Sequence, residues 1–281
     1  MVTDRPSLTA QRAAIYRAAH QLVDIPPVFG DPLALRIVGA HAESELRAGR
    51  EPRAAPQAAS LRAFIAARSR YAEDRFADAF DHGLRQYVVL GAGLDTFAYR
   101  GRFEHVRVFE VDHPATQGWK RQRLGETAIA IPESVVYAPV DFEQETVREG
   151  LARAGFDFAR PAFFAWLGVT PYLTRNAIMA TLGTIAMATR PGSEIVFDFA
   201  TPQGEQDRGR TWRLTLAARL GSIGEPLNSS LAPTELEADV GALGFSGSEV
   251  ADSDALNALY FDGRTDGLVL RGGHIMRAWV G

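Results

Sequence analysis

At 281 residues the chain is long enough for one large α/β domain with an added helical segment, or for two small domains. A formal net charge of −4 gives no electrostatic reason to expect a nucleic-acid partner, because binding a phosphate backbone needs a concentrated basic surface. The absence of cysteine excludes disulfides, thiolate nucleophiles and cysteine-ligated zinc. We find no signal peptide and no apolar run of membrane-spanning length, so we expect a cytoplasmic protein with no membrane partner.

The first part of the chain has the apolar spacing of helices. Helices are predicted over residues 8–23, 32–48 and 57–80. Two proline-containing stretches, residues 26–27 and 51–56, separate them. The pattern predicts an N-terminal helical cap joined to the rest of the chain.

We expect the cap over residues 1–56 and a ligand-binding domain over residues 57–281. The two proline stretches are predicted to act as hinges, so the cap should be mobile and close over a bound ligand. The substrate pocket is expected to be built by the cap and a late insert near residues 205–230, with contacts from Tyr16, Phe29 and Tyr71.

From residue 86 onward, strands alternate with helices. The strands are predicted at residues 86–90, 106–111, 134–140, 161–167, 193–199, 245–250 and 274–279. The helices between them are predicted near residues 94–100, 114–124, 143–153 and 174–189, with a later helix start at Thr234. Such alternation is typical of a doubly wound, mostly parallel α/β sheet of Rossmann-like type, here with seven strands, the last pair antiparallel.

A glycine pair follows the first predicted strand directly. Gly91 and Gly93 form the turn, and the next strand ends in Glu110 and Asp112 about twenty residues later. Glycine lets the backbone approach a ligand closely, and a carboxylate at the second strand end can accept both hydroxyls of a ribose. The spacing indicates a nucleotide-type cofactor site, with a glycine turn that serves packing alone as the alternative.

The turn lacks the third glycine of a dinucleotide fingerprint. Thr96 takes that position, and Asp95 places a carboxylate where a phosphate would have to approach. An anionic ligand is therefore disfavoured. S-adenosylmethionine fits better, because it carries a sulfonium and an ammonium on an adenosine body.

Further cofactor contacts are expected at the neighbouring strand ends. Asp141 and Phe142 suit an adenine, which donates from its amine and packs on its flat face, although Asp141 could instead cap a helix. Arg68 and Arg70 are expected on the last turns of the long helix, where an arginine could clamp a carboxylate. A surface pair with Glu73 or Asp74 is the alternative for each arginine.

The loop after the fourth strand, residues 166–174, should lie beside the reacting methyl group. Tyr172 is therefore a candidate substrate contact and catalytic residue, unless it only packs under the loop. His113 follows Asp112 and is the other catalytic candidate. The histidine spacing does not support a zinc site, and no Gly-x-Ser-x-Gly elbow indicates a hydrolase, so no metal is predicted.

Together these motifs resemble the leucine carboxyl methyltransferase family of S-adenosylmethionine-dependent enzymes. The resemblance covers residues 60 to 200 well. Its bacterial branch includes carboxyl O-methyltransferases that act on aromatic polyketides. The runs that carry it are Ala67-Arg68-Ser69-Arg70-Tyr71, Leu90-Gly91-Ala92-Gly93-Leu94-Asp95-Thr96, Phe109-Glu110-Val111-Asp112-His113-Pro114, Val140-Asp141-Phe142 and Trp166-Leu167-Gly168-Val169-Thr170-Pro171-Tyr172-Leu173.

The resemblance implies a role for each matching residue. Arg68 would bind the cofactor carboxylate, Gly91 its methionine portion, Asp112 with Glu110 its ribose, and Asp141 with Phe142 its adenine. One position departs from the family pattern, because many members have a glutamate where this chain has Leu167. The cofactor ammonium must then find acceptors elsewhere, such as backbone carbonyls of the glycine turn.

We interpret the chain as an O-methyltransferase for a small organic acid, such as an aromatic polyketide or another secondary metabolite. A carboxylate acceptor needs no base, since its pKa near 4 leaves it ionised at neutral pH. The first alternative is a hydroxyl methyltransferase with His20, His41 or His113 as base. The second is a cofactor-binding regulatory protein without catalysis, which Leu167 would favour. The sequence makes no prediction of the oligomeric state.

Overall fold

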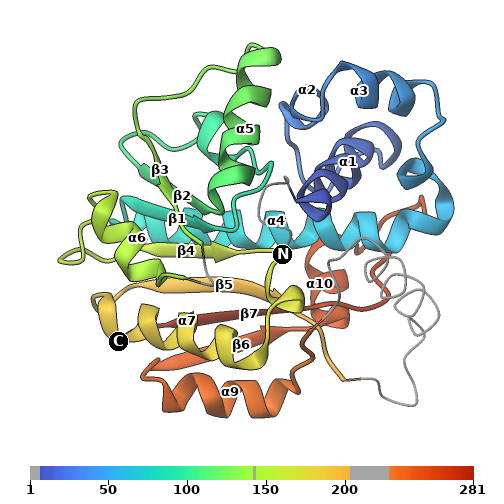
Figure 1. Cartoon of the computed structure of the whole chain (residues 1–281). Helices are drawn as coiled ribbons and strands as arrows, with labels where there is room; N and C mark the ends of the chain where they lie inside the picture. The colour runs from blue at the N-terminus through green and yellow to red at the C-terminus, as the bar shows by residue number, and fades with distance from the viewer. Residues whose placement is uncertain (1–6, 142–143, 203–227) are drawn as a thin grey trace.

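The computed structural model describes residues 7–141, 144–202 and 228–281 (Figure 1). Seven strands form one sheet in the order β3-β2-β1-β4-β5-β7-β6, with β7 antiparallel to both neighbours and all other pairs parallel. The predicted doubly wound, mostly parallel sheet is thus confirmed. The strands are β1 (Gln86–Leu90), β2 (Arg107–Asp112), β3 (Val135–Pro139), β4 (Phe163–Trp166), β5 (Glu194–Phe199), β6 (Gly247–Ala251) and β7 (His274–Trp279).

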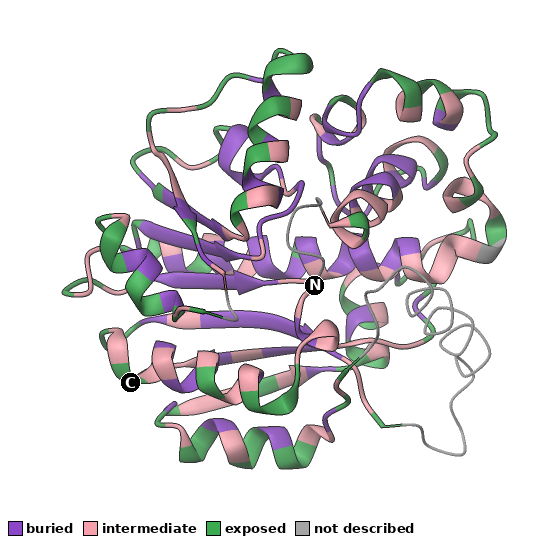
Figure 2. Ribbon diagram, in the orientation of Figure 1, coloured by how far each residue is buried: buried purple, intermediate pink, exposed green. Residues whose placement is uncertain are grey.

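The sheet is covered by helices on both faces, so its central strands are buried (Figure 2). Every residue of β1 is buried, and alternate side chains enter different cores. Tyr87 and Val89 pack into the core shared with the cap, whereas Val88 and Leu90 pack into the core on the other face. This two-sided burial explains the continuous apolar run in the strand.

Short and long helices surround the sheet. The cap contains α1 (Leu8–Val23), α2 (Ala34–Ile37) and α3 (Ala40–Arg47), and the short turns η1 (Pro52–Ala54) and η2 (Pro56–Ala58) lead into the long helix α4 (Ala59–Asp81). The remaining helical elements are η3 (Phe97–Tyr99), α5 (Pro114–Glu126), α6 (Val147–Arg153), η4 (Thr170–Tyr172), α7 (Arg175–Ala188), α9 (Pro233–Ala242) and α10 (Ser253–Tyr260).

Some predicted helices differ from the observed ones. Residues 32–48 form two helices, because Gly39 adopts a φ of +88° that interrupts the first. The helix predicted near residues 94–100 is a single turn, η3. The long helix is found close to its predicted range, but Arg68 and Arg70 lie near its middle and not on its last turns.

Two predicted features lie outside the described residues. Phe142, the expected adenine contact, is one of them. Most of the late insert near residues 205–230 is the other, since residues 203–227 are not described. Among the described residues, no helix is both long enough and apolar enough to cross a membrane.

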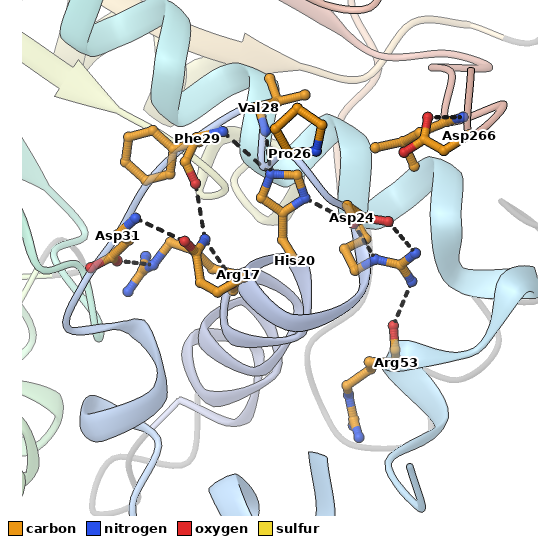
Figure 3. Close-up of polar contacts among 12 residues, drawn as sticks. Arg17, His20, Asp24, Pro26, Val28, Phe29, Asp31, Arg53 and Asp266 are labelled. Carbon is orange, nitrogen blue, oxygen red and sulfur yellow. Dashed lines mark hydrogen bonds and ion pairs between the residues drawn. The ribbon is translucent and has the colours of Figure 1, made fainter. Parts of the chain in front are cut away.

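The turn between α1 and α2 is held by a buried polar network (Figure 3). His20 is fully buried, its Nε2 accepts hydrogen bonds from the backbone N–H groups of Val28 and Phe29, and its Nδ1 lies 2.8 Å from an oxygen of Asp24. Asp24 also accepts two hydrogen bonds from Arg62 of α4. The stretch predicted as a hinge is therefore fastened to two helices.

Candidate active site

A continuous cavity of about 2860 Å³ lies at the carboxyl edge of the parallel strands. Its described walls include α1, α4, the glycine turn after β1, the loop after β4, the end of β5, α7 and the segment 266–274. Ligands bind at this edge in doubly wound sheets, where the connections from β1 and β4 leave in opposite directions. Its volume exceeds that of a typical single-ligand pocket, which is roughly 300–1,000 Å³.

The glycine turn is shaped by close neighbours on two sides. Gly91 has a φ of +67°, and a Cβ added there would collide with Val169 Cγ2. Gly93 has a φ of +41°, and its added Cβ would lie 2.9 Å from the Cβ of Ala10 in α1. Both glycines line the cavity. The cap therefore packs directly against the turn, and a larger side chain at either position would displace a wall of the cavity.

Asp112 lies at the end of β2 and lines the cavity beside this turn. Its carboxylate accepts hydrogen bonds from the backbone N–H of Gly93, at 2.5 Å, and of His113, at 2.7 Å. Burial raises the pKa of this carboxyl above its ordinary value, and the two N–H bonds oppose that rise. Each oxygen keeps a lone pair for a further donor, as binding a ribose requires.

Glu110, predicted to share the ribose with Asp112, has a different role. It is fully buried, with Lys120 Nζ 2.7 Å from one oxygen and the Tyr99 hydroxyl donating to the other at 2.8 Å. Lys120 Nζ also lies 3.4 Å from the carbonyl of Ala92 in the glycine turn. The prediction is corrected: Glu110 belongs to a buried network beneath the turn, because its side chain has no exposed surface and lies outside the described lining of the cavity.

Arg68 reaches the cavity from α4 and meets Asp198, a carboxylate for which the sequence motifs predicted no role. Arg68 Nη1 donates to Asp198 Oδ2 at 2.9 Å, and a Cβ added to Gly168 would lie 2.5 Å from Arg68 Nη2. Asp198 lines the same cavity from β5. Arg70, in contrast, bonds Asp74 on the exposed side of α4 at 2.8 Å, as the alternative for this residue predicted.

The other predicted contacts divide into those at the cavity and those outside its described lining. Tyr16, Leu167 and Tyr172 line it. Asp141 follows β3 outside that lining, where its carboxylate accepts from the Gln144 side chain at 2.9 Å. The N-cap of α6 is Thr146, so the alternative that Asp141 caps this helix is wrong.

Two predicted substrate contacts are corrected. Phe29 is 3% exposed and packs within the core, with the Arg100 guanidinium 5.2 Å from its ring. Tyr71 is 4% exposed, and its hydroxyl donates to Glu249 at 2.9 Å. Both lie outside the described lining of the cavity. Aromatic side chains near a site are as useful to the core as to a ligand, and the sequence alone could not separate the two roles.

The predicted histidine bases differ in position. His20 is fully buried in the cap network, and His41 is exposed on α3 away from the cavity lining. His113 lines the cavity, but its Nδ1 accepts from the Ala115 N–H at 3.2 Å as the N-cap of α5. His274, which was not among the predicted bases, also lines the cavity, from β7. His20 and His41 are thus not placed to act on a ligand.

Two arginines in the cavity lining were missed as well. Arg12 of α1 and Arg271 of the segment 266–274 line it, and their side chains make no ion pair or hydrogen bond within the part of the chain that the structure describes. The sequence did not indicate a binding role for either residue. Arg12 is one of several polar residues on a predicted helix, and Arg271 lies in a glycine-containing segment without a motif. Among the described residues, no group of acidic or histidine side chains is arranged to hold a metal ion.

These residues fit the expected cofactor. Asp112 keeps lone pairs for ribose hydroxyls, Gly91 and Gly93 present bare backbone to the cavity, and Arg68 brings a guanidinium to the same cavity. S-adenosylmethionine combines a ribose, a cationic centre and an amino-acid carboxylate. The ribose has a suitable partner in Asp112 and the carboxylate has one in Arg68, and both side chains line the cavity.

Comparison with known sequences decides the family. The leucine carboxyl methyltransferase family model matches residues 10–186. The chain belongs to this family. The family expected from the sequence is confirmed, and with it the enzyme class, a methyltransferase.

Two relatives illustrate the relationship within the leucine carboxyl methyltransferase family. YktD of Bacillus subtilis is 35% identical over 205 residues, covering 72% of this chain and 67% of YktD. Rv3787c of Mycobacterium tuberculosis is 31% identical over 222 residues, covering 76% of this chain and 71% of the relative. The provisional names of both describe S-adenosyl-L-methionine-dependent methyltransferases.

Solved structures support the fold. A crystal structure of a Thermobifida fusca protein, provisionally named a methyltransferase, has a TM-score of 0.59 at 19% identity and covers 99% of this chain and 96% of its own. A DUF574 family protein of Streptomyces avermitilis has a TM-score of 0.54 at 14% identity, with 99% of both chains covered. Both likenesses extend over the cap as well as the sheet.

Proposed function

We propose that this protein transfers a methyl group from S-adenosylmethionine to a carboxylate of a small organic acid, such as an aromatic polyketide or another secondary metabolite. The methyl donor follows from the relatives that are named as dependent on it. The observation that supports a carboxylate acceptor is the presence of two arginines on the cavity wall, Arg12 and Arg271. Neither has an ionic partner among the described residues.

The arginines matter because an acidic acceptor must be drawn in and oriented. A guanidinium binds a carboxylate through two parallel hydrogen bonds, which fixes the direction in which the acid enters. Arg12 belongs to the cap, and Arg271 belongs to the segment before β7. The apolar body of the acid would pack on Phe64, Ile65 and Leu268, which line the same cavity.

The reaction asks mainly for geometry from this chain. S-adenosylmethionine supplies an activated methyl group on a sulfonium. The glycine turn, Asp112 and Arg68 would hold the donor at the strand edge, and the cap would hold the acceptor oxygen in line with it and exclude water. Such positioning accounts for a large part of the rate in reactions of this kind.

The cap is part of the same proposal. We assign residues 1–56 to the cap and residues 57–281 to the cofactor-binding domain. Ala10 against the glycine turn, and Tyr16 on the cavity wall, support a cap that completes the acceptor site. Tyr172, on the loop after β4, contributes a second aromatic contact from the opposite domain.

A hydroxyl acceptor is the second candidate, and His274 is the observation that favours it. This histidine lines the cavity at the start of β7, paired in register with Phe199. His113 is the other histidine in the described lining, but it caps α5 beside Asp112 on the ribose side. A phenol or alcohol would need one of them as base.

Product chemistry separates the two candidates. The protein would be incubated with S-adenosylmethionine carrying a labelled methyl group and a panel of aromatic acids, phenols and hydroxy acids. We expect label in a product that mild alkali cleaves, because methyl esters hydrolyse and aryl methyl ethers survive. An alkali-stable product that requires His274 would contradict the carboxylate proposal and support the second candidate.

A further inference from the structure

Arg68 and Asp198 form a charge pair inside the cavity, although they lie on different elements. The Arg68 side chain is 12% exposed and that of Asp198 is 4% exposed, and their closest atoms are 2.9 Å apart. Asp198 also accepts a hydrogen bond from the backbone N–H of Gly168, which begins the loop after β4. The pair thus joins α4, the loop after β4 and the end of β5 at one wall.

The hydrogen-bonding capacity of this pair is not used up. A carboxylate offers about four lone-pair directions, and Asp198 is given one donor by Arg68 and one by Gly168. A guanidinium has five N–H donors, of which Arg68 directs one to Asp198. An opposite-charge pair that faces a cavity with donors and acceptors to spare is complementary to a zwitterion.

An amino-acid zwitterion is what the cofactor carries beside its sulfonium. Arg68 supplies a cation for the carboxylate. The ammonium needs an acceptor as well, and Leu167, which lines the cavity next to Gly168, has an apolar side chain that offers none. Burying an ammonium is costly unless it is paired and hydrogen-bonded, and a carboxylate in the same cavity is the strongest acceptor for it.

We propose that Asp198 supplies this carboxylate: Arg68 and Asp198 together receive the amino-acid end of the cofactor, with Arg68 binding its carboxylate and Asp198 its ammonium. The proposal rests on the proposed use of S-adenosylmethionine. It assigns Asp198 a direct contact with the cofactor, which differs from the simpler role of holding Arg68 in place.

Three related ligands separate the two roles of Asp198 by calorimetric titration. S-adenosylhomocysteine carries both charges, its deamino analogue keeps only the carboxylate, and its decarboxylated analogue keeps only the ammonium. Asp198→Asn keeps the size of the side chain and an oxygen for the Gly168 N–H. Binding of S-adenosylhomocysteine to the wild type tests the proposed function separately, before any variant is compared.

Asp198→Asn should weaken S-adenosylhomocysteine roughly tenfold to a hundredfold, the range for losing a hydrogen bond between charged groups, and should change the affinity of the deamino analogue less than about twofold. Arg68→Gln should weaken S-adenosylhomocysteine and the deamino analogue, which carry the carboxylate, and should leave the affinity of the decarboxylated analogue nearly unchanged. If Asp198→Asn weakens the deamino analogue as much as S-adenosylhomocysteine, Asp198 only positions Arg68 and the proposal is overturned.

A second variant removes the risk that a lone buried charge unfolds the protein. Arg68→Gln with Asp198→Asn neutralises both partners, which costs less stability than removing one. In this double variant S-adenosylhomocysteine should lose about tenfold more affinity than the deamino analogue, because only the former has an ammonium to lose. Equal losses for the two ligands would overturn the proposal. Leu167→Glu in the Asp198→Asn background should recover affinity for S-adenosylhomocysteine and its decarboxylated analogue, which carry the ammonium, but not for the deamino analogue.

Discussion

Thr96 of the glycine turn donates a hydrogen bond of 2.6 Å to Asp31 of the cap, across 65 residues of sequence. The same carboxylate lies 2.8 Å from Arg17 Nε, and Arg17 Nη2 donates to the Leu94 carbonyl at 2.6 Å. The cap is therefore bonded to the loop that is expected to hold the cofactor. We therefore expect a cofactor held by this loop to affect the cap through these contacts.

Thr96→Val should loosen the cap. The substitution keeps the shape of the side chain and removes its bond to a buried carboxylate, which we expect to cost about 1.5–3 kcal/mol. Amide hydrogen exchange should become faster across α1 in this variant and slower across α1 in the wild type when S-adenosylhomocysteine binds.

Thr189→Val is the matched control for the cap. Its hydroxyl donates to the Ile185 carbonyl at the end of α7, outside the described cavity lining. This variant should leave exchange across α1 unchanged. Exchange across residues 8–50 that is identical with and without ligand would show that the cap does not respond to the cofactor.

The Lys120–Glu110 pair should matter for stability. Lys120→Met leaves the fully buried Glu110 carboxylate without its cation, which typically costs about 3–5 kcal/mol. Urea unfolding should show this loss, and adding Glu110→Gln should recover most of it because no isolated charge remains. A loss in the double variant as large as in the single one would mean that charge is not the cause.

The sheet could be predicted from the sequence because its strands are short apolar runs between clear turn signals. All seven strands lie where the pattern predicted them, and α1 matches its predicted range of residues 8–23. Gly91, Gly93 and Asp112 were found at the cavity because consecutive parallel strands bring their carboxyl ends to one edge.

Residues whose role depends on distant partners could not be predicted. Glu110 and Asp112 are two residues apart on one strand. Only the structure shows that the carboxylate of Glu110 is bonded to Lys120 and Tyr99. Asp198 lies between Phe197 and Phe199 in β5, and its partners, Arg68 and the Gly168 N–H, come from distant parts of the chain. Tertiary pairing of this kind leaves no periodic signal in the sequence.

Cofactor affinity should depend on pH through Asp112. Burial raises the pKa of this carboxyl above the ordinary value of 3.8. Protonation removes the charge that accepts the ribose hydroxyls, so affinity should fall as the pH is lowered through this raised pKa, which happens at a higher pH than for an exposed aspartate. Titrations at a series of pH values should show the fall in the wild type. Asp112→Asn should bind the cofactor more weakly, with an affinity that does not change over the same pH range. An equal fall of affinity in that variant would assign the pH dependence to another group.

Turnover with a carboxylic acid should be nearly independent of pH from about 6 to 9, because an acid with a pKa near 4 is ionised throughout that range. His113→Ala and His274→Ala should then retain most of the wild-type rate at saturating cofactor. A rate that rises near the ordinary histidine pKa of about 6.5, and a large loss in one of these variants, would instead indicate a base acting on a hydroxyl.

Cofactor placement at the strand edge is tested by a calorimetric titration of S-adenosylhomocysteine into the wild type, Asp112→Ala and the control Asp262→Ala, whose exposed side chain lies outside the described cavity lining. We predict saturable binding to the wild type and the control. In Asp112→Ala the affinity should be weaker by about 1.5–3 kcal/mol, the range for losing hydrogen bonds to a charged group. Absence of binding to the wild type, or equal affinities for wild type and Asp112→Ala, would contradict the placement of the cofactor at this strand edge.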